Sequence, residues 1–217
     1  MACRRGRSED HASDEYPFLR FEIYRSGRCG HYRDRTMSGI WVAESELGSL
    51  FNPSIVSTQC AILTASLVRP ANTDAYAVND AVSNSTSAPT IMTFANAARV
   101  NGGSGYLVKA EFCTDQAACT AAFRLHLFST TITPVNDNAA YLSQWVNRAV
   151  RVGHLDFLTV SQEGTGSTSA FCLWSGSPLL YVCDAADTAL YGLLETKSVF
   201  TPASSQNFSI KLGVDKN

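Results

Sequence analysis

Alternation of apolar and polar residues in short runs is the feature that most restricts the fold of this 217-residue chain. The segment 207–212, Asn-Phe-Ser-Ile-Lys-Leu, is apolar at every second position. In an extended strand, Phe208, Ile210 and Leu212 would therefore share one face. A helix needs apolar residues three and four positions apart, and that spacing is nearly absent after residue 60. Because strands with one apolar face need a second apolar layer to cover them, the pattern predicts an all-β protein of two packed sheets.

Two neighbouring runs, Gly-Tyr-Leu-Val-Lys-Ala-Glu-Phe-Cys and Ala-Ala-Phe-Arg-Leu-His-Leu-Phe, give the clearest pair of strands, at 105–113 and 121–128. Lys109 and Glu111 would face solvent from the first run, and Arg124 from the second. The apolar faces are in register and opposite charges can meet across the polar face, so the sequence predicts that the two strands form one hairpin. The side chains expected in the core are Tyr106, Val108, Phe112, Phe123, Leu125, Leu127, Phe208 and Ile210.

Further short apolar runs, separated by turn residues, fill residues 61–217. About nine or ten strands in all predict an antiparallel β-sandwich that is jelly-roll-like. The segment 138–150 is the one stretch whose spacing allows a short helix. The other expected strands are 61–68, 75–82, 89–94, 152–160, 170–174, 178–183 and 188–196.

A glycine-rich stretch, Asn-Gly-Gly-Ser-Gly at 101–105, raises the question of a phosphate-binding loop. Such a loop needs a lysine and a hydroxyl residue after its last glycine, or a helix that follows the glycines. Here the glycines are followed by Tyr-Leu-Val, which reads as a strand. The stretch is therefore expected to be a turn, and no cofactor is expected.

Candidate catalytic residues are few. His126 shares a strand face with Arg124, where a role in the sheet is favoured over a role as a base. His154 and Asp156 have the i, i+2 spacing that places both on one strand face, and a serine from 161–169 would be needed to complete a triad. No segment positions such a serine, so the sequence predicts a protein that is not an enzyme.

Seven cysteines occur without a Cys-x-x-Cys pair, which makes a zinc site an unfavoured reading. Strand parity places Cys113 and Cys119 on opposite faces of the expected hairpin, so a disulfide between them is not expected. Free thiols, largely buried, are predicted instead. The net charge of −2 gives no general attraction to nucleic acid or to an anionic membrane, and neither is expected as a partner.

The first 36 residues differ from the rest of the chain, because they hold eight Arg and six Asp or Glu. They contain no apolar segment typical of a secretory signal, so synthesis and folding in a reducing cytoplasm are expected. Two interpretations remain open for this leader. In the first, the leader is disordered or lies upstream of a natural start at Met37. In the second, it is an arm that becomes ordered on a partner.

Residues 37–60 are much more apolar than the leader. Exposure of such a segment would favour aggregation, so it is expected to be covered by its own sandwich or by a neighbouring subunit. Twenty-four extended residues span roughly 80 Å, which is enough to reach an adjacent subunit. Residues 1–60 are therefore predicted to form an extended arm, and 61–217 the sandwich domain. The residues expected to contact a partner are Trp41, Leu47, Leu50, Phe51 and Ile55.

Several segments occur together in a fixed order: RPANTDAYAVNDAV, FANAARVNGGSGYLVKA, FRLHLF, PVNDNAAY, RVGHLDF, YGLLET and TPASSQNFSI. This ordered set, over residues 67–213, resembles a family of small structural proteins of tailed bacteriophages. One departure from the family's pattern is Asn79, where similar sequences often have glycine before the aspartate.

The resemblance implies a virion component, here expected to be a decoration or cement protein on the capsid surface. Its implied partners are the major capsid protein and further copies of itself, as a homotrimer. The alternative is a tail, baseplate or fibre component that binds a receptor or carbohydrate. In that case exposed aromatic rings would stack on sugars. The aromatic residues considered for this role are Tyr141, Trp145, Trp174 and Tyr181.

Overall fold

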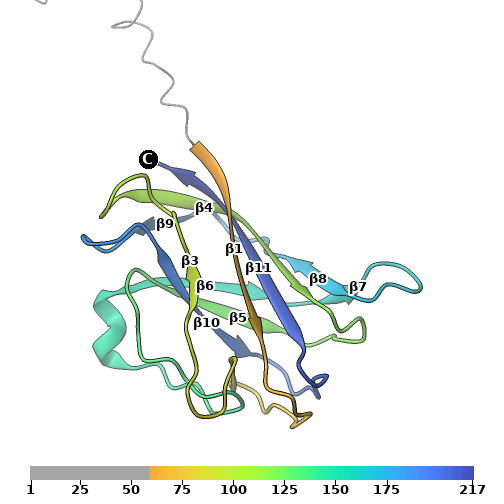
Figure 1. The fold of residues 1–217 in the computed structure, drawn as a ribbon. Helices are drawn as coiled ribbons and strands as arrows, with labels where there is room; N and C mark the ends of the chain where they lie inside the picture. Colours follow the sequence, from red (N-terminus) through yellow and green to blue (C-terminus); the bar gives the residue numbers. More distant parts are fainter. Residues whose placement is uncertain (1–58) are drawn as a thin grey trace, which may run out of the picture. The chain divides into compact units, whose positions relative to one another are not determined.

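The structure is a computed structural model that describes residues 59–217. Two antiparallel sheets form the two layers of the domain (Figure 1). The six-stranded sheet has the order β1 (Gln59–Val68), β11 (Asn207–Lys216), β4 (Ser104–Thr114), β8 (Ala170–Leu173) and β7 (Ser161–Gln162), and β9 (Leu179–Val182) also pairs with β4. The five-stranded sheet has the order β2 (Ala81–Val82), β10 (Leu190–Thr196), β5 (Phe123–Phe128) and β6 (Arg151–Phe157), and β3 (Met92–Phe94) also pairs with β10.

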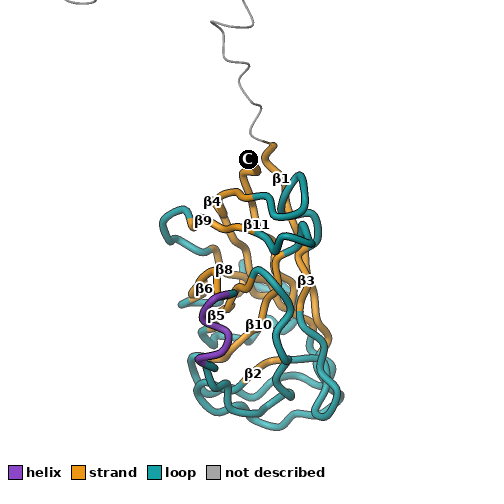
Figure 2. The backbone as a smooth tube through the Cα atoms, turned by 90° about the vertical axis from the view of Figure 1, so that its left-hand side faces the viewer, coloured by secondary structure: helices purple, strands orange, loops and turns teal. Residues whose placement is uncertain are grey.

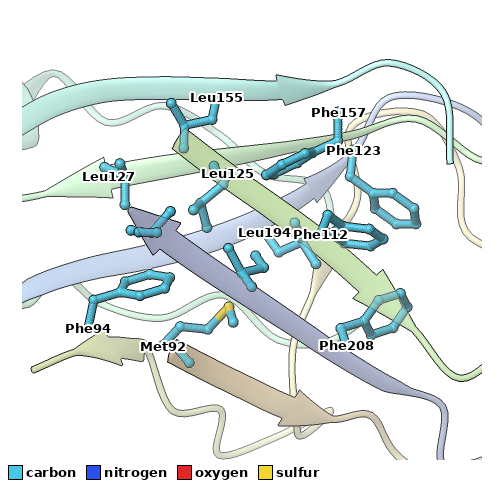
Figure 3. Close-up of a cluster of buried hydrophobic side chains, with 14 of the residues drawn as sticks. Met92, Phe94, Phe112, Phe123, Leu125, Leu127, Leu155, Phe157, Leu194 and Phe208 are labelled. Atoms are coloured by element: carbon cyan, nitrogen blue, oxygen red, sulfur yellow. The ribbon is translucent and has the colours of Figure 1, made fainter. Parts of the chain in front are cut away.

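The core lies between the two sheets and is rich in aromatic rings (Figure 3). Phe112 of β4 stacks on Phe123 of β5 with ring centroids 4.6 Å apart, and Phe208 of β11 packs against both. The predicted all-β sandwich is therefore confirmed at the level of two packed antiparallel sheets. A five-residue 3-10 helix, η1 (Trp145–Ala149), lies within the segment where a short helix was allowed.

The predicted hairpin between the runs at 105–113 and 121–128 is wrong, because β4 and β5 belong to different sheets. β5 pairs instead with β10 and β6. Two apolar strand faces can be buried together in two ways, side by side in one sheet or opposite each other across a core. The chain takes the second way here. The polar face of β5 therefore meets residues of β6, and Arg124 pairs with Asp156.

Five of the eight core residues named from alternation lie on strands β5 and β11, and all of these are buried. On β4 the prediction holds for Phe112 but is wrong for Tyr106 and Val108, which are half exposed. The cause is a β-bulge: consecutive residues of β11 pair with Lys109 and Leu107, so that Val108 has no residue opposite. One extra residue exchanges the two faces of the strand. Leu107 consequently fills the core position.

The glycine-rich stretch is a turn that leads into β4, as predicted, and Gly102 has a positive φ of 70°. Asn79 adopts the same left-handed region, with φ of 71°. Glycine adopts this region freely, and asparagine is among the few other residues that tolerate it. The departure from glycine at position 79 therefore leaves the turn intact.

The five cysteines of residues 59–217 are all free, which agrees with the expectation of unbridged thiols. Cys119 and Cys183 are buried, and burial raises the pKa of each thiol, that of Cys183 to about 11. Cys113 and Cys172 are half-buried, and Cys60 is exposed. Burial is therefore confirmed for Cys119 and Cys183, and the expectation of burial is wrong for Cys60.

A buried ion pair joins the loops at one end of the sandwich. Arg69, 2 % exposed, lies 3.1 Å from a carboxylate oxygen of Asp137, which is 4 % exposed. The Tyr76 hydroxyl donates to Asp137 at 2.5 Å and accepts from Arg69 at 2.9 Å, and the Ser83 amide also donates to Asp137. Burial and the neighbouring carboxylate raise the pKa of Tyr76, which keeps the hydroxyl a donor. The cluster is well satisfied, as a buried charge requires.

The remaining N–H groups of Arg69 bind its own loop and the loop before β11. They donate to the carbonyl oxygen of Asn72 at 2.7 Å and to that of Ala203 at 3.3 Å. Gln206 is buried beside them and donates to the Thr114 hydroxyl at 2.7 Å. Arg69 therefore ties together the chain after β1, the chain before β11 and the long connection that contains Asp137.

Replacement of Phe123 by Ala tests the core position that faces β4. It should lower the free energy of unfolding by about 3–5 kcal/mol because it removes a fully buried ring. Val108→Ala on β4 is the matched comparison, and because the bulge exposes Val108 it should change stability by no more than about 0.5 kcal/mol. Denaturant titration of both variants measures these differences. Similar losses from both would place Val108 in the core and contradict the bulge.

Replacement of Asp137 by Asn tests the buried ion pair. The substitution keeps the shape but leaves the Arg69 charge without its counter-ion, so it should lower the free energy of unfolding by about 3–5 kcal/mol. The control is Glu111→Gln, which removes the exposed pair with Lys211 and should cost less than about 1 kcal/mol. Equal losses in the free energy of unfolding, measured by denaturant titration, would mean that the buried pair contributes no more to stability than the exposed pair.

Candidate functional site

Three charged side chains form a row on the outer face of the five-stranded sheet. Glu195 of β10, Arg124 of β5 and Asp156 of β6 are in register. Arg124 donates two hydrogen bonds to Asp156, at 2.5 Å from Nε and 2.9 Å from Nη2. These bonds hold the pKa of Asp156 below its usual value and raise the pKa of Arg124. Asp156 is thus a carboxylate fixed on a guanidinium.

His126 lies on the same outer face, as alternation predicts, but it is 3 % exposed. The connection between β5 and β6 covers it, and the Tyr141 ring centroid is 4.4 Å from that of His126. Nε2 of His126 is 2.6 Å from Glu195, and Nδ1 is 3.5 Å from a guanidinium nitrogen of Arg151. Burial lowers the pKa of His126, and Arg151 acts in the same direction, while Glu195 opposes it. A neutral ring that donates to Glu195 and accepts from Arg151 fits this geometry.

His154 and Asp156 share a strand face, as their spacing predicts. Nε2 of His154 is 3.8 Å from Asp156, which is too long for a hydrogen bond. Both carboxylate oxygens of Asp156 already accept from Arg124. Burial, followed by the charge of Arg124, lowers the pKa of His154. A catalytic triad needs the carboxylate to orient the histidine by a hydrogen bond, so the geometry of His154 and Asp156 does not support a triad.

The four aromatic residues considered for sugar binding have different environments. Trp145 is 79 % exposed, whereas Tyr181 is buried and donates its hydroxyl to the Ala97 carbonyl oxygen. Trp174 packs partly against the core, and Tyr141 is half-buried over His126. Trp145 is therefore the member of the set whose ring is largely exposed. Tyr141 and Trp145 both line a surface groove beside the beginning of β6.

The outer face of the six-stranded sheet carries the largest side chains that sequence reasoning missed. Tyr106 of β4 lies directly opposite Leu180 of β9, and both are about half exposed. Val182, Val108 and Ile62 extend the same face along β9, β4 and β1, and Ile62 is 65 % exposed. We call these five residues the outer apolar face. A cluster of exposed apolar side chains on one sheet marks an interaction surface.

Asp215 lies within the outer apolar face, between Cys60 and Tyr106 in the cross-strand row. Its Oδ1 is buried and has no hydrogen-bond partner among residues 59–217. A buried acceptor without a donor is costly, and native proteins rarely contain one. A donor from a partner, or from water held by a partner, would satisfy it.

The sequence contains a signal that would have located the outer apolar face. The run Pro-Leu-Leu-Tyr-Val-Cys at 178–183 is apolar on both strand faces. A strand whose outer face meets solvent alternates, whereas a strand covered on both sides is apolar throughout. The bulge hid the remaining part, because it moved Tyr106 and Val108 to the outer face.

The predicted partner-contact residues in the arm, Trp41, Leu47, Leu50, Phe51 and Ile55, lie outside the described residues. Residues 56–58 separate the last of these from β1 in the sequence. Gln59, the first residue of β1, pairs with Lys216 beside the C-terminus (Figure 1). Tyr106 belongs to the next row of pairs, with Cys60 and Asp215, so β1 begins at the end of the sheet that carries the outer apolar face.

Within residues 59–217, no group of three or more His, Cys, Asp or Glu side chains is placed to hold a metal ion. The same part of the chain has no helix with the length and apolarity needed to cross a membrane. Searches against protein-family models and against curated proteins found no match for this chain.

The buried, neutral His126 predicts a pH dependence of stability. Its pKa is lowered in the folded protein, so below about pH 6.5 the unfolded chain binds the proton first and folding weakens. The loss continues until the pH reaches the lowered pKa of the folded state. The free energy of unfolding should therefore fall between about pH 7.5 and about pH 5.5, and His126→Gln should reduce that fall. Denaturant titrations at both pH values measure it. His154→Gln is the comparison, and its smaller burial should give a smaller change.

Proposed function

We propose that this protein is a non-enzymatic structural protein of a tailed-bacteriophage virion, which decorates the outer surface of the major capsid lattice and stabilises it. The observation that carries the proposal is the outer apolar face, at the end of the sandwich where residues 1–58 join β1. The ordered motifs over residues 67–213 support the same assignment through their resemblance to phage structural proteins.

The finer fold we propose is a jelly roll. Its support is the way in which the strands pair from the ends of the chain inward. β1 pairs with β11, β2 and β3 pair with β10, β4 pairs with β8 and β9, and β5 pairs with β6. This is one long antiparallel ribbon wound into two sheets, with successive segments passing between them, as in double Greek-key folds. Such domains present broad sheet faces, which suit attachment to a shell.

The occupant that we propose for the outer apolar face is the major capsid protein. Coverage of Ile62, Tyr106 and Val182 would remove exposed apolar surface from water, and a donor from the shell would satisfy Asp215. The arm supplies a second contact, through Trp41, Leu50 and Phe51 among others, on an adjacent capsid subunit. Because the protein would bind the assembled lattice and not the free subunits, binding would stabilise the lattice by mass action. Homotrimers at threefold positions would multiply this effect through avidity.

Changes to the outer apolar face test the proposal. A full-length variant with Leu180→Asp and Val182→Asp should bind bare capsids at least about tenfold more weakly, because charges would be buried against the shell. Val199→Asp is the control, since Val199 is also an exposed apolar residue but lies in the connection before β11. Sedimentation of the protein with capsids measures binding. Wild-type affinity in the double variant would overturn this docking, and loss of a homo-oligomer with unchanged capsid binding would assign the face to self-association.

Two further measurements separate the proposed parts. A full-length variant with Trp41, Leu50 and Phe51 changed to Ser should also bind capsids more weakly, and unchanged binding would contradict the arm. Quantitative mass spectrometry of purified particles gives the copy number. A capsid decoration protein should be present in fixed proportion to the major capsid protein, whereas the alternative tail or fibre component would be present in far fewer copies.

A further inference from the structure

A groove of about 530 Å³ lies beside the beginning of β6, on the five-stranded side of the sandwich. Its lining comes from the connection before β6, including the helix η1, and from the beginning of β6. Figure 2 shows η1, in purple, beside β6. Its lining combines aromatic rings, amide side chains and cations, without any Asp or Glu. The size and the mixture of apolar and polar groups are typical of a small-molecule site.

Trp145 is held in place beside this groove although its side chain is 79 % exposed. The Arg148 guanidinium lies 4.7 Å from the centre of the Trp145 ring, and it also donates to the Trp145 carbonyl oxygen at 3.2 Å. This cation–π contact supports one face of the ring. The high exposure leaves the rest of the ring in contact with water. An indole fixed in this way is a platform for a flat apolar surface of a ligand.

The groove is cationic. Among residues 59–217, no carboxylate lies within 4.0 Å of the guanidinium of Arg148 or of Arg151, although Arg69 and Arg124 are so paired. Arg151 is anchored by the Nδ1 atom of His126, whose other nitrogen is occupied by Glu195. Two anchored guanidinium groups without counter-ions favour an anionic ligand, and their planar donors match a carboxylate.

Amide and hydroxyl side chains complete the lining. Gln144 and Asn147 flank Trp145 on η1, and Ser143 precedes them. Such groups both donate and accept hydrogen bonds, which suits the many hydroxyls of a sugar ring. The backbone of the helix is fixed by bonds from the Asn147 amide to Gln144 and from the Val150 amide to Asn147. The polar groups are therefore presented on an ordered turn next to the aromatic platform.

We propose that this groove binds an acidic saccharide, one that carries a carboxylate on a pyranose ring. The apolar face of the sugar stacks on Trp145, Arg148 and Arg151 bind the carboxylate, and Asn147 binds the hydroxyls. The polar amides favour a sugar over a nucleotide, and the absence of acidic side chains favours an acidic sugar over a neutral one. The proposal goes beyond capsid attachment and uses other residues than the outer apolar face, which Arg151 borders at Leu180 and Val182.

The test is titration calorimetry of the full-length protein with tetrasaccharides of hyaluronan, polygalacturonate and α2,8-linked sialic acid. At least one should bind, and chitotetraose, a neutral tetrasaccharide, should bind at least about tenfold more weakly. Trp145→Ala should reduce affinity for the acidic ligand by at least about tenfold. Arg151→Gln should remove the preference for the acidic ligand over chitotetraose, and with it the dependence of affinity on salt.

Val146→Ser is the matched control, because Val146 is 76 % exposed on the same helix but does not line the groove. It should leave saccharide binding unchanged, and an effect equal to that of Trp145→Ala would overturn the proposed pose. Failure of all three acidic tetrasaccharides to bind would overturn the proposal. Equally tight binding of single-stranded oligothymidylate, lost in Trp145→Ala, would reassign the groove to nucleic acid. Each outcome can be read while capsid binding remains intact.

Discussion

The face-to-face contact between β4 and β5 is the interaction on which the rest of the structure depends. Phe112 and Phe123 stack across the core, and Phe208 closes the group (Figure 3). Because these two strands oppose each other, every later strand must add to one sheet or the other: β6 and β10 to β5, β8, β9 and β11 to β4. The two outer faces of the sandwich follow from the same arrangement, since each strand presents its remaining side chains there.

The two outer faces are built for different surroundings. On the five-stranded sheet, Arg124 pairs with Asp156, Glu195 pairs with His126 and Lys197, and the β5–β6 connection covers His126. The charges of this row are satisfied within the sheet. On the six-stranded sheet, Tyr106 and Leu180 lie side by side in partial contact with water. Within residues 59–217, Oδ1 of Asp215, beside Tyr106, is buried without a hydrogen-bond partner. Coverage by a partner would therefore remove more unfavourable exposure from this second face than from the first.

Alternation predicted which side chains of β5 and β11 are buried, because those strands are regular, and Phe123 and Ile210 are in the core as expected. It failed at Val108, where a bulge shifts the faces, since one inserted residue leaves no mark in a hydrophobic pattern. It also failed to choose between a hairpin and opposed strands, because both arrangements bury the same faces. The candidate surfaces were harder to predict from the sequence than the core. Arg151 and Trp145 line one groove because of the path that the β5–β6 connection takes. The alternation of apolar residues within a strand gives no information about that path.

Three of the motifs that carry the phage resemblance supply residues to the buried network. Arg69 and Tyr76 come from the first motif, Asp137 from the segment PVNDNAAY, and Gln206 from TPASSQNFSI. All four are buried at one end of the sandwich, where Arg69 bonds to Asp137 and to the loop before β11. Removal of either charge from such a network leaves the other unpaired, so these positions tolerate little change. Leu180 and Trp145 are exposed and lie outside these segments, so substitutions there leave the buried network intact.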